Sequence, residues 1–75
     1  LMALSDDDQI AELTLPTDWA DKTIVELNIR RNFGVSVLGS HLGGKFLSSP
    51  GAVSLLMAGD VLGVMGKKEA ISAVE

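Results

Sequence analysis

One stretch decides the fold of this chain, because a helical pattern of apolar residues gives way within it to a strand pattern: Ile24-Val25-Glu26-Leu27-Asn28-Ile29-Arg30-Arg31-Asn32-Phe33-Gly34-Val35-Ser36-Val37. The apolar residues of its first half share one helical face and predict an amphipathic helix from Lys22. Asp21 is the expected N-cap. Arg30 and Arg31 would lie in the last turn, where positive charge suits the helix dipole, and Gly34 would end the helix in a left-handed conformation.

The residues that follow the helix predict a hairpin. Residues 35–42 alternate in polarity and are rich in β-branched side chains, which indicates a strand. This strand runs into Gly43-Gly44, and a Gly-Gly pair between apolar runs favours a two-residue turn. Residues 45–47 would form the short return arm.

The C-terminal third predicts a central strand and a second helix. Residues 61–65 are almost continuously apolar, which is typical of a strand at the centre of a sheet with both faces covered. The shorter run 53–57 before it, ended by a turn at 58–60, predicts a brief strand or bridge. Residues 67–75 carry an apolar stripe at helical spacing.

The N-terminal part predicts one more strand, because residues 10–15 alternate in polarity before Pro16. Residues 1–9 hold three adjacent aspartates and predict a flexible, acidic lead-in. Trp19 is expected to be a packing anchor beside the helix start. The resulting order, β-α-β-β-β-α, predicts a small α/β (α+β) domain with a mostly antiparallel or mixed four-stranded sheet and two helices.

Composition narrows the function. The 75 residues contain no cysteine, which excludes disulfides, thiolate metal sites and cysteine nucleophiles. A formal net charge of -4 argues against nucleic acid as a partner. The apolar share of 47% in so short a chain favours a surface covered by a partner, or a piece of a longer protein. No apolar run reaches the length of a membrane span, and no secretory leader is evident.

Four features of the sequence are candidates for a chemical role. The residues from Gly39 to Lys45 match the start of a phosphate-binding P-loop, but the following residues cannot open a helix, so that interpretation is rejected. His41, the lone histidine, lacks a nucleophile or a second metal ligand near it in sequence, so no catalytic or metal site is predicted. Asp60 favours a turn that bonds its own backbone. Arg30 and Arg31 beside Phe33 suit a phosphate with a stacked base, although the residues alone favour complementation of the helix dipole, because such pairs are common at helix ends.

These patterns together resemble a known family, the TrkA-C or RCK-C domain of Trk/Ktr-type potassium uptake regulators. The resemblance covers residues 10–75. Its most specific parts are the Leu-Asn-Ile-Arg segment leading to Phe33-Gly34 and the Gly59-Asp60-Val61-Leu62 segment.

The resemblance implies a dimerising regulatory domain rather than an enzyme. It implies a homodimer, a Rossmann-type nucleotide-binding domain elsewhere in the full-length protein, and a cytoplasmic location beside a membrane potassium channel or transporter subunit. No cofactor is expected within this domain. By resemblance the dimer interface is a candidate site for cyclic di-AMP, with Arg31 as phosphate donor and Arg30 as its rival. Val25, Phe33 and Val37 would form the apolar flank, and His41 a polar contact.

Two alternatives remain open at this point. The first is a purely structural assembly module that binds no ligand. The second is a fragment of an enzyme that uses His41 and Asp60 as acid and base, which would require a nucleophile or metal set outside these residues.

Overall fold

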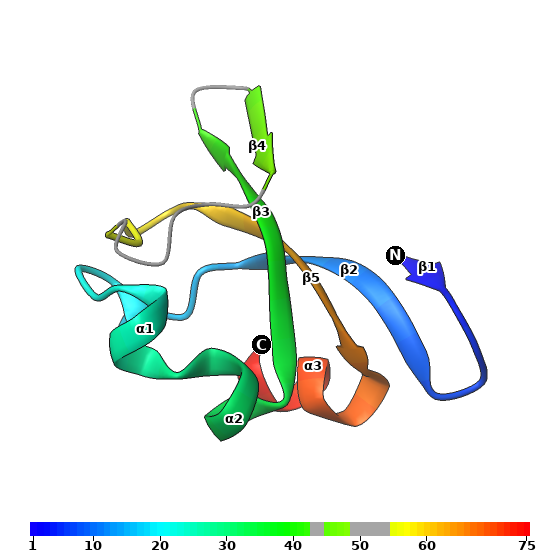
Figure 1. Cartoon of the computed structure of the whole chain (residues 1–75). Helices are drawn as coiled ribbons and strands as arrows, with labels where there is room; N and C mark the ends of the chain where they lie inside the picture. Colours follow the sequence, from blue (N-terminus) through cyan, green and yellow to red (C-terminus); the bar gives the residue numbers. More distant parts are fainter. Residues whose placement is uncertain (43–44, 49–54) are drawn as a thin grey trace.

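A single antiparallel sheet organises the chain, for which a computed structural model describes residues 1–42, 45–48 and 55–75 (Figure 1). The sheet has five strands in the order β1-β2-β5-β3-β4. Their bounds are β1 (Met2–Ala3), β2 (Asp8–Thr14), β3 (Val35–Leu42), β4 (Lys45–Ser48) and β5 (Val61–Lys67). The α+β class and the central position of β5 are confirmed, and β1 is the strand beyond the predicted four.

The predicted helix is divided into two short ones, α1 (Ile24–Leu27) and α2 (Ile29–Phe33). Asn28 separates them with a left-handed φ of 46°, a conformation that asparagine adopts more readily than most residues. Gly34 ends α2 with φ 74°, as predicted, and its amide donates to the Arg30 carbonyl. A 3-10 turn, η1 (Thr17–Trp19), precedes α1, and α3 (Lys68–Val74) closes the chain where the second helix was expected.

The cap of α1 differs from the prediction. Thr23, not Asp21, is the N-cap: the Glu26 amide donates to its hydroxyl at 3.0 Å, and the Thr23 amide donates to the Glu26 carboxylate at 3.1 Å. This reciprocal pair is a capping box. Asp21 instead has a left-handed φ of 64° in the preceding turn, where its amide donates to the Leu56 carbonyl.

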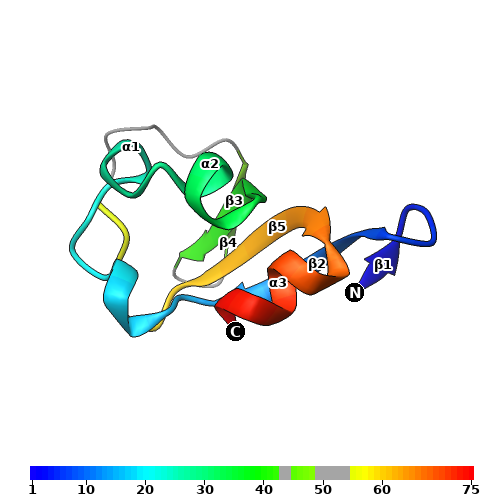
Figure 2. The same cartoon turned by 90° about the horizontal axis from the view of Figure 1, so that it is seen from below.

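The core lies where α2 and α3 pack against the sheet. Its most buried side chains, 2% exposed or less, are Ile29, Leu62, Ile71, Val35 and Val64. Figure 2 shows α3 along β2 and β5, and α2 contacts both β3 and α3. Trp19 is the anchor that the sequence predicted, at 3% exposure and with its ring centroid 5.0 Å from that of Phe33.

Among the described residues, helices cover the central strand on one face only, which corrects the prediction for residues 61–65. Leu62 and Val64 are fully buried toward the helices, whereas Met65 on the opposite face is 38% exposed. The reason is that α2 and α3 both contribute to the same core cluster, through Ile29 and Ile71. The other side of the sheet is left to small and partly exposed residues.

The N-terminal residues form a hairpin rather than an unfolded lead-in. Met2 and Ala3 pair with Ile10 and Gln9, and the Leu4 amide donates to the Asp8 carbonyl at 2.9 Å. We call β1, β2 and the turn between them the N-terminal hairpin. The flexibility of residues 1–9 stays a prediction. Their pairing with β2 makes β1 the edge strand of the sheet.

Two of the predicted features fall partly beyond the described residues. The Gly43-Gly44 turn lies outside them, although β3 and β4 pair antiparallel on either side of it. Residues 53–54 of the short apolar run also lie outside, while Leu55 makes an isolated bridge with Thr23. The turn at 58–60 is confirmed, because the Asp60 carboxylate accepts from the Met57 amide at 3.1 Å.

Candidate anion-binding groove

The sheet face turned away from the core, which we call the outer face, is built by strand register. Adjacent strands align Ile10 with Met65 and Met65 with Ser36, and this row continues the pairing of Met2 with Ile10. A second row aligns Glu12, Gly63 and Gly39. Because side chains alternate along a strand, each row puts its residues on the same face.

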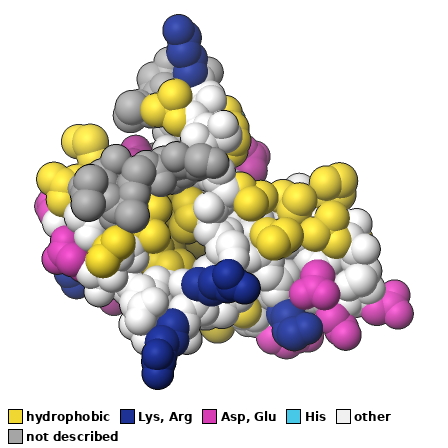
Figure 3. Space-filling view, viewed as in Figure 1, with side chains coloured by type: hydrophobic (Ala, Val, Ile, Leu, Met, Phe, Trp, Pro, Cys, Tyr) yellow, Lys and Arg dark blue, Asp and Glu magenta, His cyan; other side chains and the backbone are white. Residues whose placement is uncertain are grey.

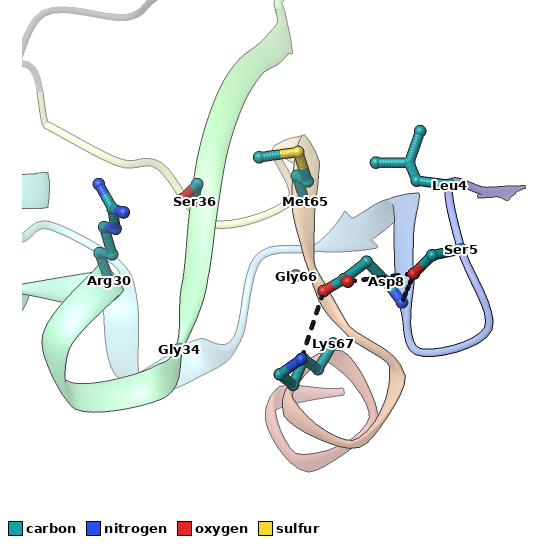
Figure 4. A pocket seen from close by; sticks show the side chains of 9 residues that line it. All are labelled: Leu4, Ser5, Asp8, Arg30, Gly34, Ser36, Met65, Gly66 and Lys67. Carbon is teal, nitrogen blue, oxygen red and sulfur yellow. Dashed lines mark hydrogen bonds and ion pairs between the residues drawn. The ribbon is translucent and has the colours of Figure 1, made fainter.

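A groove of about 560 Å³ opens on the outer face between α2 and the N-terminal hairpin. Arg30 and Gly34 line one side, Ser36, Met65 and Gly66 form the floor, and Lys67 lies beside the hairpin residues. Leu4, Ser5 and Asp8 make up that far wall. Figure 4 shows the Arg30 side chain facing the groove from one side and the Asp8 carboxylate from the other.

The two cations of the groove differ in their partners. The Lys67 ammonium lies 3.7 Å from an Asp8 carboxylate oxygen. Arg30 is exposed on α2, and among the described residues no carboxylate lies within ion-pair distance of it. An Arg guanidinium with its donors free is suited to a phosphate, which it can bind through two parallel hydrogen bonds. One side of the groove is therefore equipped to bind an anion.

Apolar side chains accompany this charge. Met65 at 38%, Leu4 at 49% and Met2 at 54% exposure lie in or beside the groove. Figure 3 shows hydrophobic side chains gathered over this part of the sheet, with positive and negative side chains along its lower edge. An exposed apolar patch edged by charge is the pattern of a ligand or partner site.

The structure separates Arg31, which the resemblance gives as phosphate donor, from its rival Arg30. Arg30 lines the groove, and Arg31, which is equally exposed on α2, is not among the lining residues. A shift of one residue on a helix turns a side chain by more than a quarter of a circle, so neighbours cannot share one face.

The three predicted apolar residues fall into different environments. Phe33 and Val37 are partly buried and pack against the core. Phe33 also lines a separate hollow of about 300 Å³ with Trp19, Leu27 and Val74. Val25 is 62% exposed on α1.

His41 lies on the outer face with a partner of its own. Its Nε2 is 2.8 Å from a Glu12 carboxylate oxygen, and its ring meets Phe46 edge-on at 5.1 Å. Glu12 is on β2 and His41 on β3, so the pair crosses the central strand, where Gly63 has no side chain to obstruct it. Asp60 is held in its own turn, so the structure gives His41 and Asp60 separate partners.

Sequence reasoning missed the floor and far wall of the groove, which are Ser36, Met65, Lys67 and the hairpin residues. The alternation of β3 and β5 contains the signal for the floor, because Ser36 and Met65 are out of phase with the buried Val35 and Val64. No pattern in the sequence predicts that residues 1–9 fold back onto β2.

Residues 10–75 match the TrkA-C domain family. The chain belongs to this family. Its relatives include Ktr system potassium uptake protein A of Bacillus subtilis (strain 168), to which it is 32% identical over 72 residues, or 96% of this chain. The chain spans 32% of the length of that relative.

Two groups of solved structures share the fold. The RCK C domain of KtrA in complex with cyclic di-AMP has a TM-score of 0.82 at 28% identity, covering 93% of this chain and 82% of that one. The RCK_C domain dimer of S. agalactiae BusR, also in complex with cyclic di-AMP, has a TM-score of 0.73 at 28% identity, covering 87% of this chain and 82% of that one. BusR was also solved with its promoter DNA, in a chain of which this one covers 32%.

Within the described residues of this TrkA-C domain, no group of three or more His, Cys, Asp or Glu side chains gathers as a metal site. None of the helices in that part of the chain is long and apolar enough to cross a lipid bilayer.

Proposed function

We propose that this TrkA-C domain is the cytoplasmic regulatory part of a potassium uptake or cation transport system, which dimerises and binds cyclic di-AMP to gate a membrane subunit. The observation that carries the proposal is the groove with Arg30 on one side and exposed apolar residues beside it. Two domains of this fold, both 28% identical to the chain, are described in complex with that dinucleotide. A phosphodiester and an adenine need a guanidinium and an apolar surface respectively.

Arg30 replaces Arg31 as our preferred phosphate donor, and its place in the groove lining supports this choice. Val25 stays in the proposal as an exposed apolar contact for a base, reached from α1. Phe33 and Val37 pack beneath the surface, so their role would be to position α2 and β3. His41 would act through its pair with Glu12, at the far end of the outer face.

A homodimer suits this ligand because both have two-fold symmetry. Each chain would present the same Arg30 to one of the two phosphodiesters. The exposed apolar residues Met2, Leu4 and Met65 give the outer face the character of a surface covered in an assembly. Ligand binding can favour one dimer geometry only by its differential affinity for the two arrangements. That difference would be passed to a Rossmann-type domain and the channel or transporter subunit.

The test is a calorimetric titration of the chain with cyclic di-AMP. The proposal expects saturable binding at one ligand per two chains, lost in Arg30→Ala and kept in Lys45→Ala, which removes the same charge from exposed β4. Arg31→Ala serves as the second comparison and should retain most of the affinity. Binding that survives Arg30→Ala but not Arg31→Ala would reverse our ranking, and no heat in any variant would reject the ligand.

An assembly module without a ligand is the second candidate, favoured by the same exposed apolar residues. It predicts that sedimentation shows a dimer, and that neither Arg30→Ala nor added cyclic di-AMP changes the fraction of dimer. The net charge of -4 disfavours contact of this domain with phosphate backbones, whereas a BusR chain, of which this domain covers 32%, was solved with promoter DNA. A promoter-DNA binding assay on the full-length protein and on this domain alone distinguishes the two expectations.

A further inference from the structure

The far wall of the groove belongs to residues outside the family match. The match begins at residue 10, whereas Leu4, Ser5 and Asp8 all line the groove. They belong to the N-terminal hairpin, which begins before the segment that the family match covers. Of the three, Asp8 is the one that carries charge.

The Asp8 carboxylate is held in place by several bonds. The Ser5 hydroxyl donates to it at 3.1 Å, and the Asp8 amide donates to that same hydroxyl at 3.0 Å. The Asp8 carbonyl accepts from the amides of Leu4 and Ser5, which closes the hairpin turn. The Lys68 amide donates to the Asp7 carbonyl at 2.9 Å and attaches the turn to the start of α3. The hairpin and its hydrogen bonds therefore hold the Asp8 carboxylate in place.

The carboxylate neutralises one of the two groove cations. Asp8 and Lys67 are cross-strand neighbours in the β2–β5 register, and their charged atoms lie 3.7 Å apart. Arg30 on the opposite side has no such partner among the described residues. The charges that line the groove therefore sum to a single uncompensated positive charge per chain, which matches one phosphodiester.

We propose that Asp8 is a charge-selectivity residue of the groove: by neutralising Lys67 it limits the site to one phosphodiester charge per chain and disfavours ligands with a terminal di- or triphosphate. This inference rests on the proposed function of the groove and specifies its ligand class. Coulomb repulsion from Asp8 grows in proportion to the charge of the ligand, so each added phosphate charge increases the penalty. Asp8 thereby reduces the extra attraction that a nucleoside triphosphate would gain from Arg30 and Lys67 together.

The experiment compares ligands of different charge on one pair of variants. Asp8→Asn removes the carboxylate charge, and Asp6→Asn removes the same charge from an exposed turn position outside the groove lining. Cyclic AMP, cyclic di-AMP and ATP without metal ions are titrated by NMR at about 0.15 M salt, where charges more than roughly 8 Å away are largely screened. Far-UV circular dichroism checks that each variant is folded.

Asp8→Asn should strengthen binding of cyclic AMP and cyclic di-AMP about two- to fivefold, the range that a half-exposed ion pair supports. It should strengthen ATP binding by a clearly larger factor, and Asp6→Asn should change none of the three by as much. Lys67→Met removes a positive charge instead of a negative one, and it should weaken the binding of ATP more than the binding of cyclic AMP.

The inference would be overturned if Asp8→Asn changed the affinity for all three ligands by the same factor. It would also be overturned if Asp6→Asn changed these affinities as much as Asp8→Asn does. The comparison of ATP with cyclic AMP does not depend on cyclic di-AMP. If cyclic di-AMP bound to no variant while Asp8→Asn still favoured ATP over cyclic AMP, the proposed function would fail and the selectivity role of Asp8 would stand.

Discussion

The two faces of strand β5 serve different purposes, although they alternate along the same seven residues. Leu62 and Val64 are fully buried against the helices, while Met65 and Lys67 face the groove and are exposed. Buried side chains contribute their full transfer free energy to folding, whereas exposed ones remain available for contact with another molecule. Neighbouring residues of this one strand therefore differ in role: those pointing to the helices stabilise the fold, and those pointing to the groove are available for binding.

Leu62→Ala tests the core side of this comparison and should have the largest effect. Truncating a fully buried leucine costs about 2–5 kcal/mol, because the transfer free energy is lost and a cavity remains. For a domain of this size that is a large share of the total stability. Urea denaturation followed by circular dichroism measures it, and a cost as small as that of Met65→Ala would contradict the division of faces.

Gly39→Ala tests whether the outer face is itself tightly packed where the Phe46 ring of β4 lies against it. A Cβ at Gly39 would collide with the Leu47 carbonyl oxygen and lie 2.5 Å from the Phe46 ring. The backbone oxygen cannot move aside, so we expect a loss of about 1–3 kcal/mol. Gly63→Ala is the matched comparison, since its Cβ would lie 3.2 Å from the Phe46 ring and at an ordinary contact distance of 3.9 Å from the Gly39 carbonyl oxygen. The midpoint of thermal unfolding should be clearly lower for Gly39→Ala than for Gly63→Ala. The reverse order would contradict the close contact of Gly39 with β4.

Thr23→Ala tests the start of α1, which carries the exposed Val25. Loss of the capping box should cost about 1 kcal/mol, because the Glu26 amide loses its acceptor. Ser72→Ala, at an exposed position of α3, is the control and should be nearly neutral. A chemical denaturation midpoint that is equal in the two variants would show that the cap contributes nothing.

Met65→Ala should have the smallest effect on folding and the clearest effect on recognition. Its side chain is 38% exposed, so we expect a stability change below about 1 kcal/mol. The proposed function expects weaker binding of cyclic di-AMP in the same variant, since an apolar contact of the groove is removed. A fully retained affinity measured by calorimetry would separate Met65 from the ligand site.

Much of the fold could be predicted from the sequence because its signals are local. Gly34 ends a helix, residues 35–42 alternate as a strand should, and residues 61–65 are apolar enough for a central strand. Features that depend on tertiary context could not be predicted. The left-handed Asn28 divides a pattern that looks continuous, and the N-terminal hairpin depends on backbone pairing with β2 rather than on an apolar pattern of its own.

The candidate site was predictable only in part, for a related reason. The sequence indicated an arginine pair at the end of a helix, but a choice between Arg30 and Arg31 requires the angle at which α2 meets β3. Asp21 is the cap that the sequence predicts because it precedes the apolar pattern, whereas the capping box of Thr23 and Glu26 begins two residues later. Ser36 and Met65 could have been recognised by their phase along the strands, whereas Asp8 and Leu4 reach the groove only through the fold of the hairpin.

The most direct test of the account is an NMR titration of isotope-labelled protein with cyclic di-AMP, mapped onto the two faces of the sheet. We predict that the largest amide shifts fall on α2 and the outer face, at Arg30, Ser36 and Met65, with little change at Ile71 in α3. Shifts concentrated around Trp19, Phe33 and Val74 would place the ligand in the hollow on the other side and contradict the central claim.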